Sequence, residues 1–344
     1  MNSLPKISIR VDGSMPPRDC VELAKAADDA GFAGVWFAEN AFARGILPAA
    51  AACAVATARV RINAGVFNPY SRHPTMMAME IGALDELSGG RASLSIGAGI
   101  QSAAAKMGFD AEKPVPALRD TLAIVRGLLH GEEVDHAGPG FSARKIRLNY
   151  RPRADIPVYL AGRGHLTVKL AGEAADGLLV SNMCSLEFAG RLAEAMRSSA
   201  RAAGRDAPRH VVQYMPCATH SDSRQALNAA KHAIGDMLPR FWALGQKLGS
   251  AKDALLSGTP MGEDEFADVA ARLRAGGDPA QVLDDRYALA FSLAGTPDEC
   301  LKLAASYKAA GIDELALTFS GPTAKEEIAA IGGALARAEK SYGR

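Results

Sequence analysis

The stretch "RVRINAGVFNPYSRHPTMMAMEIGALDELSGGRASLSIGAG" runs from Arg59 to Gly99 and contains a strand pattern, a helix pattern and a second strand pattern. The first eight residues, Arg59–Val66, are rich in apolar residues and are typical of a strand. Apolar residues at helical spacing predict a helix over Thr75–Leu87, which "SGGR" closes. Ala92–Gly99 again predicts a strand. The stretch therefore predicts one strand–helix–strand unit of an α/β fold.

The same alternation extends along the whole chain. We predict strands at Lys6–Arg10, Gly34–Ala38, Arg59–Val66, Ala92–Gly99, Ile156–Gly162, Gly177–Ser181, His210–Thr219 and Ile312–Phe319. We predict helices at Pro16–Phe32, Leu47–Thr57, Thr75–Leu87, Ala117–His130, Thr167–Ala175, Leu186–Gly204, Thr296–Gly311 and Ala324–Tyr342. The strands are continuous apolar runs, as expected for strands buried on both faces. Eight such units predict a (β/α)8 TIM barrel, with a doubly wound parallel sheet as the alternative.

Two segments lie outside this alternation. Glu133–Leu148 has the pattern of an inserted hairpin. Lys231–Arg286 is long and rich in helix patterns, and it lies between the seventh and eighth predicted strands. We expect this helical insertion to cover the barrel mouth, and a helical subdomain that serves only dimerisation is the other interpretation. The prediction is one barrel domain over residues 1–344.

Composition excludes several classes of protein. The chain has 344 residues, a formal net charge of +1 and 48% hydrophobic residues, and it has no block of like charges. A general nucleic-acid or membrane surface would carry a strong charge excess. Its five cysteines are far apart and lack zinc-ligand spacing. The first residues do not resemble a signal peptide, and no apolar run reaches membrane-spanning length. We therefore expect a cytoplasmic protein with reduced thiols.

Two glycine-rich turns follow predicted strands. "GAGIQS" occupies Gly97–Ser102, and "AGRGHLT" occupies Ala161–Thr167 immediately before a helix. Glycines let a backbone approach a ligand, and free N–H groups at a helix N-terminus attract an anion. Arg163 and Thr167 could add hydrogen bonds to a phosphate. Ordinary tight turns are the alternative, but together the two turns favour a flat, phosphate-bearing cofactor across the barrel mouth.

The sequence lacks the residue patterns that several other kinds of catalytic site require. The seven histidines are scattered, and no metal-ligand constellation, GxSxG motif or strand lysine for a Schiff base is present. A metal site is therefore not expected. What remains is a reaction in which a cofactor supplies the difficult chemistry.

With these motifs in view, the chain resembles the luciferase-like flavin and deazaflavin oxidoreductases. Within that superfamily it is most similar to the coenzyme F-420-dependent methylenetetrahydromethanopterin reductases. The resemblance is carried by "NPYSRHP", "SGGRA" and the following "GAG", and by "IPVYLAG", "LAGEAADGLLVS", "FSLAGTPDE" and "KAAGIDEL". It covers most of the chain outside the Lys231–Arg286 insertion.

The resemblance implies a barrel that binds FMN or coenzyme F-420 at its mouth. It implies a cis peptide bond at Gly65–Val66, forming a bulge behind the cofactor ring, which the "NPYSRHP" turn would clamp. The matching cofactor-binding residues are Gly65, Val66, Gly97, Ala98, Gly99, Ala161, Gly162, Arg163, Gly164, His165, Thr167, Ser181 and Asn182.

Three positions depart from the reductase pattern. Glu39-Asn40 stands where Asp-His is usual, Arg10 replaces a glutamate, and Ile100 replaces an acidic residue. Replacing a carboxylate with Arg10 inverts the local charge and favours a different, anionic substrate. Glu39 could act as acid or base, Asn40 as a hydrogen-bond donor, and Arg10 as a third catalytic residue. An ion pair of Glu39 with Arg10 or Arg44 is the structural alternative.

The expected function is hydride transfer between F-420 and a small organic substrate. An FMN-dependent monooxygenase that uses reduced flavin, oxygen and a separate flavin reductase is the alternative. A non-catalytic flavin-binding protein is the alternative from another class. The resemblance also implies a homodimer, with Leu47–Thr57 and Thr75–Leu87 as candidate interface helices.

Overall fold

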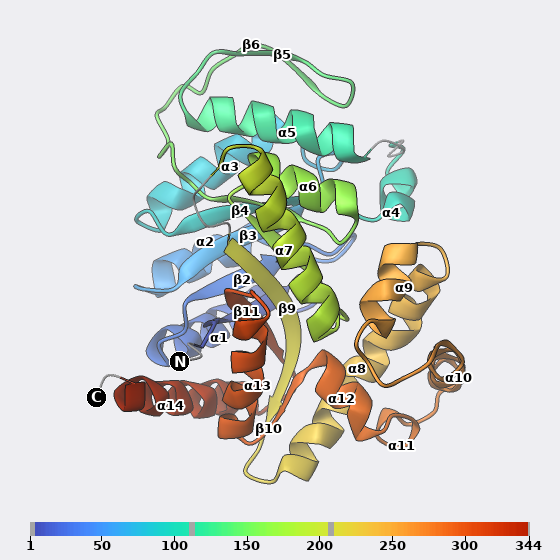
Figure 1. Ribbon diagram of the computed structural model, residues 1–344. Helices are drawn as coiled ribbons and strands as arrows, with labels where there is room; N and C mark the ends of the chain where they lie inside the picture. Colours follow the sequence, from blue (N-terminus) through green and yellow to red (C-terminus); the bar gives the residue numbers. More distant parts are fainter. Residues whose placement is uncertain (1–3, 110–113, 206–209, 343–344) are drawn as a thin grey trace.

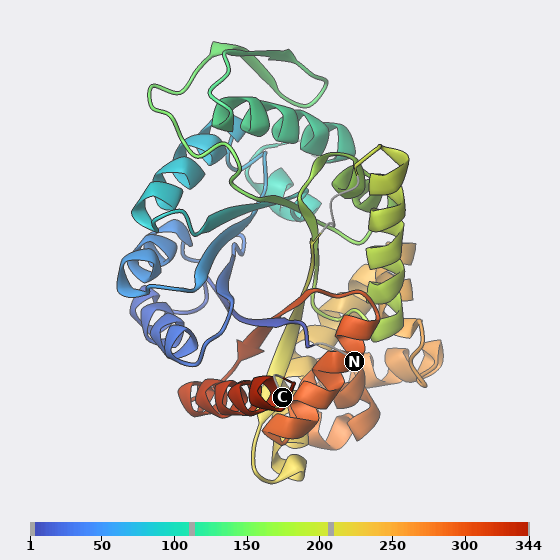
Figure 2. The ribbon, with the colours of Figure 1, turned by 60° about the vertical axis from the view of Figure 1, so that its left-hand side comes forward.

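The computed structural model describes residues 4–109, 114–205 and 210–342. Within them, eight parallel strands close into a barrel surrounded by helices (Figure 2). The barrel strands are β1 (Lys6–Asp12), β2 (Gly34–Ala38), β3 (Arg61–Phe67), β4 (Ala92–Gly97), β7 (Val158–Ala161), β8 (Gly177–Val180), β9 (His210–Thr219) and β11 (Glu314–Phe319). The predicted (β/α)8 TIM barrel is confirmed.

The ring closes where the last strand meets the first. Strand β11 pairs in parallel with β1, Glu314 lying opposite Lys6, and with β9, Glu314 lying opposite Val212. Strand β9 also pairs with β8, so every barrel strand has two neighbours. A doubly wound sheet would leave two open edges, and that alternative is therefore wrong.

The helices that follow the strands form the outer layer (Figure 1). They are α1 (Pro17–Asp29), α2 (Leu47–Ala56), α3 (Pro74–Leu87), α5 (Pro114–Leu129), α6 (His165–Ala174), α7 (Leu186–Ala202), α13 (Pro297–Ala309) and α14 (Ala324–Tyr342). Local signals explain their starts: proline occupies the first turn of α1, and Thr296 and Glu299 form a capping box on α13.

A charged cluster lies at the N-terminal end of the barrel interior. The fully buried carboxylate of Glu314 accepts hydrogen bonds from Ser8 Oγ of β1 (2.5 Å) and Trp36 Nε1 of β2 (2.6 Å). It also pairs with Arg61 of β3, and His210 of β9 lies 3.5 Å away. One side chain thus joins β11 to four other strands, at the end of the barrel opposite the strand C-termini.

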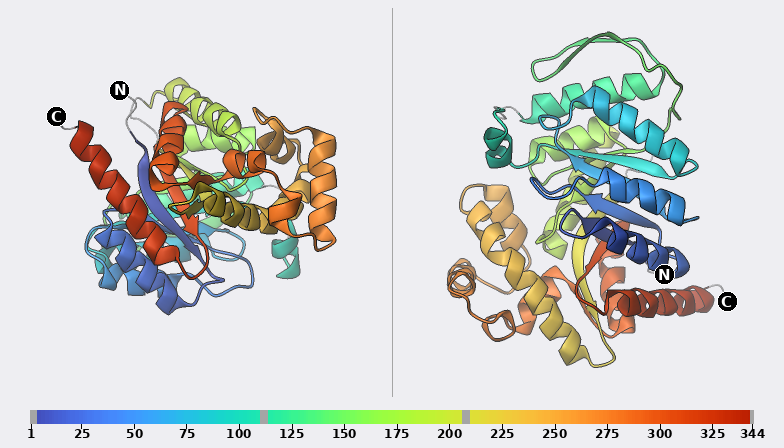
Figure 3. Two further views of the ribbon diagram at one scale, coloured as in Figure 1. Left: turned by 90° about the horizontal axis from the view of Figure 1, so that it is seen from below. Right: turned by 180° about the vertical axis from the view of Figure 1, so that it is seen from behind.

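The segment between β9 and β11 is helical, as predicted. It comprises α8 (Ser223–Gly245), α9 (Gly249–Leu256), α10 (Glu263–Arg274), α11 (Pro279–Val282) and α12 (Asp285–Phe291). These helices gather on one side of the barrel (Figure 3) around their own apolar core, in which Trp242 and Tyr287 pack against Phe266.

The insertion differs from the prediction at both ends. Helix α8 begins at Ser223, where the Asp222 side chain caps it, and not at Lys231. A short strand, β10 (Leu293–Gly295), follows α12 and pairs in parallel with β9. A three-residue strand gives too short an apolar run to be recognised from sequence.

The predicted hairpin is formed by β5 (Val134–Ala137) and β6 (Ser142–Ile146). Buried Asp120 of α5 holds it, accepting hydrogen bonds from the backbone of Gly140 (2.7 Å) and Phe141 (3.1 Å). The Phe141 ring lies 5.6 Å from the ring of Tyr70 and 5.7 Å from that of His73, centroid to centroid. The hairpin therefore packs on the "NPYSRHP" turn after β3.

Candidate functional site

Three hollows surround the C-terminal ends of the strands. Hollow A, about 460 Å³, lies among the ends of β2, β3 and β4. Hollow B, about 500 Å³, lies between the ends of β4, β7, β8 and β9 and the last turns of α8. Hollow C, about 490 Å³, lies between the end of β1 and the start of α14. This is the end of a TIM barrel where active sites are built.

The Gly65–Val66 bulge separates hollows A and B. The Gly65–Val66 peptide bond is cis, and the pairing of β3 with β4 shifts register between Ala64 and Phe67. Gly65 has φ +144°, and a Cβ there would lie 2.2 Å from the carbonyl oxygen of Ser95. Only glycine fits such a position. The bulge presents the Val66 side chain to both hollows.

Hollow B is cationic. Arg163, Arg240 and Lys247 line it, and no carboxylate does among the described lining residues. The Arg163 guanidinium lies 5.1 Å over the Phe241 ring and donates to the carbonyl of Asn182 at 3.3 Å. Uncompensated positive charge around an apolar cleft is suited to an anionic ligand.

Several polar atoms near hollow B lack partners. Arg163 Nη1, Asn182 Oδ1 and the Tyr214 hydroxyl are buried without a hydrogen-bond partner among the described residues. Buried polar groups are normally paired, so unpaired ones near a cleft mark places where a ligand would supply the partner. Burial also raises the pKa of the Tyr214 hydroxyl, which keeps that group a neutral donor.

The structure brings many of the predicted cofactor residues together at hollow B. Those that line it are Val66, Gly99, Ala161, Gly162, Arg163 and Ser181. The others support or flank this lining: Gly65, Gly97, Ala98, Gly164, His165, Thr167 and Asn182. Gly97, for example, lies directly against Val66, because a Cβ at Gly97 would lie 2.5 Å from Val66 Cγ1. The predicted loop before α6 is also present, with His165 as the first helical residue.

Glu39 and Asn40 both line hollow A. Arg72 of the "NPYSRHP" turn holds Glu39, with Nη2 lying 3.3 Å from Glu39 Oε1, and it also pairs with Glu80 of α3. The Arg72 guanidinium lies 4.5 Å over the Phe67 ring. The partner of Glu39 is thus Arg72, and the alternative of an ion pair with Arg10 or Arg44 is wrong.

The backbone of Glu39 is fixed as well, because its N–H donates to the carbonyl of Gly65 at 3.0 Å. Burial raises the pKa of the Glu39 carboxyl, and the negative charge of Glu80 adds to that effect, while Arg72 opposes it. A carboxyl with a raised pKa beside a cleft is a candidate acid or base.

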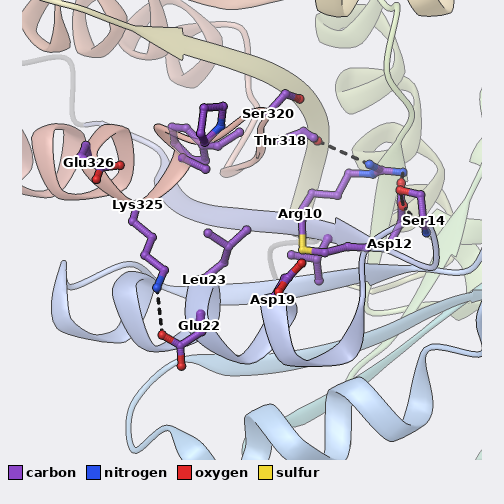
Figure 4. A pocket seen from close by; sticks show the side chains of 16 residues that line it. Arg10, Asp12, Ser14, Asp19, Glu22, Leu23, Thr318, Ser320, Lys325 and Glu326 are labelled. Carbon is purple, nitrogen blue, oxygen red and sulfur yellow. Dashed lines mark hydrogen bonds and ion pairs between the residues drawn. The ribbon is translucent and has the colours of Figure 1, made fainter.

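Arg10 lies in a different place from the other two predicted catalytic residues. It lines hollow C with Asp12, whose carboxylate it pairs with at 3.1 Å, and it reaches toward Thr318 Oγ1 at 3.5 Å (Figure 4). Its guanidinium also lies 5.1 Å over the ring of Tyr214, which lines hollow B. Arg10 therefore stands between hollows C and B and does not contact Glu39.

The Arg10 contact also affects Asp12. Burial acts to raise the pKa of the Asp12 carboxyl, but the hydrogen bonds from Ser14, the charge of Arg10 and the Asn40 side chain outweigh it and lower that pKa. Asp12 is therefore held as an anion beside Arg10, so the charge that Arg10 brings to the first strand is largely neutralised there.

Sequence reasoning missed the residues that α8 and β9 contribute. Arg240, Phe241 and Leu244 line hollow B from the last turns of α8, and Lys247 lines it from just beyond the end of that helix. Arg240 and Phe241 lie four and three residues before Leu244, a helical spacing inside the segment predicted to cover the mouth, so a signal existed. Tyr214 points into the barrel because strand residues alternate, and Val212 two residues earlier is also interior.

No group of three or more histidine, cysteine, aspartate or glutamate side chains in residues 4–109, 114–205 and 210–342 could hold a metal ion. Among the helices that the structure describes, none combines the length and apolar character needed to cross a membrane.

Comparison with known proteins gives the family. The family model of luciferase-like monooxygenases matches residues 3–314. The chain is 28% identical to the 5,10-methylenetetrahydromethanopterin reductase of Methanolobus tindarius over 292 residues, which are 83% of this chain and 86% of that protein.

Comparison with solved structures gives the same fold. The coenzyme F-420-dependent tetrahydromethanopterin reductase from Methanopyrus kandleri matches with a TM-score of 0.83 and 25% identity, covering 96% of this chain and 98% of that chain. The oxygenating constituent of 3,6-diketocamphane monooxygenase from Pseudomonas putida, in complex with FMN, matches with a TM-score of 0.72 at 18% identity, covering 95% of this chain and 96% of that chain, and shows the fold alone. The chain is therefore an enzyme that belongs to the luciferase-like monooxygenase family.

Proposed function

We propose that this protein is an oxidoreductase that binds coenzyme F-420 in hollow B and transfers hydride between it and a small organic substrate in hollow A. The observation that carries the proposal is the character of hollow B. It has three cations, no carboxylate among the described lining residues, and an unpaired buried guanidinium nitrogen on Arg163.

The residues present fit such a cofactor. Arg163 and the loop before α6 would hold the anionic tail, and Val66 would support one face of the ring. The cofactor, when bound, supplies or accepts the hydride. FMN carries one phosphate group, whereas F-420 carries a phosphate and further carboxylates. Arg163 and Lys247, with Arg240 at the boundary with hollow A, give hollow B a positive charge that suits the more highly charged tail.

The protein's own groups would then manage the substrate and one proton. Glu39 faces hollow A, and its raised pKa keeps a larger fraction of the carboxyl protonated near neutral pH than an ordinary glutamate would have. Arg72 fixes the orientation of Glu39. Asn40 lines the same hollow and can donate a hydrogen bond to the substrate. Arg10 acts at a distance from this pair, through Tyr214 and Asp12.

The test is a titration of the purified protein with F-420 and with FMN, followed by intrinsic fluorescence. Trp242 is a suitable reporter because it lies in α8 next in sequence to Phe241, which lines hollow B, although its own ring packs on Phe266. We expect micromolar or tighter binding of F-420 and weaker binding of FMN. Arg163→Gln should weaken F-420 binding by about tenfold or more, because a charge-assisted contact to the tail is lost.

Arg201→Gln is the matched control, since Arg201 pairs with Glu194 on the exposed side of α7. It should leave the affinity unchanged. Preferred binding of FMN would move the protein to the monooxygenase alternative, to be assayed with a flavin reductase and oxygen. Tight binding with no turnover of any imine or activated alkene would favour a non-catalytic flavin-binding protein. Failure of both cofactors to bind would overturn the proposal.

We also propose that the protein is a homodimer. Helix α3 exposes Met76, Met79 and Leu87 along one face, and neighbouring α2 exposes Val55. Large apolar side chains gathered on two adjacent helices are typical of an interface.

A further inference from the structure

We infer that hollow A takes a substrate with an apolar body and one anionic group, and that Arg240 recognises the anion. This inference rests on the proposed function, because it treats hollow A as the substrate chamber beside a cofactor in hollow B. It goes further in naming the substrate's chemical class and the residue that selects it.

Hollow A carries an excess of positive charge. Arg44, Arg72 and Arg240 line it, and Glu39 is the one carboxylate among its described lining residues. Glu39 shares the guanidinium of Arg72 with Glu80, which lies outside the lining. Arg44 is tethered, because its Nη1 donates to the carbonyls of Gly13 (3.3 Å) and Ser14 (2.9 Å). Among the described lining residues of hollow A, the one carboxylate is therefore already paired with Arg72, and no other could neutralise a further cation.

Arg240 is that further cation. It lies on α8 and lines both hollow A and hollow B. Its side chain makes no hydrogen bond, ion pair or ring contact with the residues that the structure describes. A guanidinium presents donors in a planar fork that matches a carboxylate, sulfonate or phosphate. A free guanidinium at the boundary of two chambers is placed to bind an anion in the outer one.

Hollow A also has an apolar wall. Three of the chain's exposed large apolar side chains line it: Phe42, which is 68% exposed, Ile100, which is 50% exposed, and Met107, which is 37% exposed. Val66 and Ala103 extend the same surface. Exposed apolar side chains gathered around one concave surface mark a binding site for an apolar ligand. A highly polar substrate would gain little from this wall.

The apolar wall and the Arg240 guanidinium would contact different parts of the ligand. The apolar wall belongs to the loop after β2 and to the segment after β4, whereas the free cation comes from α8. A molecule that contacts both would have its anion near α8 and its body over Phe42 and Met107. Its reacting carbon would then lie between Glu39 and Val66, the side chain that hollow A shares with hollow B.

The experiment uses two probes that differ in one group. 8-Anilinonaphthalene-1-sulfonate has an apolar body and one sulfonate, and N-phenyl-1-naphthylamine has the same body without the anion. Each is titrated calorimetrically into the full chain, with and without saturating F-420. We expect Arg240→Gln to weaken binding of the sulfonate by about tenfold and to leave the neutral probe unchanged. Phe42→Ser should weaken both probes, because Phe42 lines hollow A and not hollow B.

Arg224→Gln is the matched control, since Arg224 is an exposed arginine at the other end of α8. It should change neither affinity. The inference is overturned if Arg240→Gln leaves sulfonate binding unchanged, if it weakens the neutral probe equally, or if F-420 displaces the sulfonate, which would place the probe in hollow B. If F-420 does not bind at all, the proposed function fails, and the response of the cofactor-free chain to Arg240→Gln and Phe42→Ser still decides the inference.

Discussion

Glu39 is a partly buried carboxyl whose pKa is subject to opposite influences. Burial and the charge of Glu80 raise its pKa, and the guanidinium of Arg72 lowers it. The balance decides which protonation state faces hollow A near neutral pH. Because Glu80 lies on α3 and pairs with Arg72 without lining hollow A, removing its charge tests the balance without replacing a lining residue.

We predict that the Glu39 carboxyl titrates above the ordinary glutamate value, and that Glu80→Gln moves its pKa downward. Carboxyl-labelled glutamate, followed by NMR against the Glu39→Gln variant, identifies the signal. A carboxyl whose pKa is raised by folding binds its proton more tightly in the folded state. The stability advantage of the wild type over Glu39→Gln should therefore decrease as pH rises through the folded pKa.

The catalytic rate should change with pH in the same direction as this stability advantage. If Glu39 donates a proton to the substrate, the rate falls as pH rises through its pKa, and Glu80→Gln moves that decline to lower pH. Glu39→Gln should lower kcat by about a hundredfold or more and remove this limb of the profile. An unchanged pH profile in Glu80→Gln would contradict the assigned interaction.

At the scale of residues, sequence predicted the part of the site built from local motifs. Gly65 lies near the end of β3, and Gly99 and Arg163 come two residues after the ends of β4 and β7, so their neighbourhood could be predicted from the chain. The partner of Glu39 could not, because Arg72 lies 33 positions away in sequence and reaches it across the end of β3. Arg240 could not be paired with hollow A for the same reason: its position depends on the path of an inserted helix.

Helices α6 and α7 meet at a glycine. A Cβ on Gly172 would lie 2.3 Å from the carbonyl oxygen of Met196 and 2.8 Å from the backbone nitrogen of Ala200. The backbones of the two helices therefore approach closely at this point. The start of α6 carries the Arg163 loop, so this packing also positions one wall of hollow B.

We predict that Gly172→Ala destabilises the protein by about 1–3 kcal/mol, because the added methyl group overpacks the contact between α6 and α7. Gly333→Ala is the matched control in α14, where the nearest atom would be 3.7 Å from the new Cβ. It should stabilise by about 0.5–1 kcal/mol through helix propensity alone. Urea unfolding of both variants measures the difference, and equal effects would contradict the close approach.

At the scale of elements, the sequence pattern located the barrel strands and the outer helices well. Apolar runs and cap residues are local signals, and they placed α14 at Ala324–Tyr342, as the structure has it. The pattern failed for short elements. Strand β10 has three residues and α4 (Gln101–Lys106) has six, so neither completes a recognisable period. Both depend on tertiary contacts rather than on local propensity.

The exposed apolar face of α2 and α3 acts at the scale of the whole molecule. Met79 is 46% exposed, and changing it to lysine would place a charge in the proposed interface. We predict that Met79→Lys shifts the protein from twice the mass of one 35.9 kDa chain to a single chain. Light scattering after size-exclusion chromatography measures the mass.

Leu289→Lys provides the control for this change. Leu289 is 50% exposed on α12 of the insertion, so the substitution adds the same charge at an equally exposed apolar position on another face. It should leave the mass of the assembly unchanged. A dimer that survives Met79→Lys but dissociates with Leu289→Lys would assign the interface to the helical insertion instead.

The Glu314 cluster lies at the end of the barrel opposite the strand C-termini and apart from the three hollows. Strands from five places in the chain meet on that one carboxylate, and none of its partners lines a hollow. Substitutions in the turn after β3, in the loop after β2 or on α8 can therefore change the hollows without disturbing the Glu314 contacts between the strands. Ile100, which departs from the reductase pattern at the end of β4, is a change of this kind. Related barrels can in this way bind different substrates while they keep the same buried cluster at the opposite end.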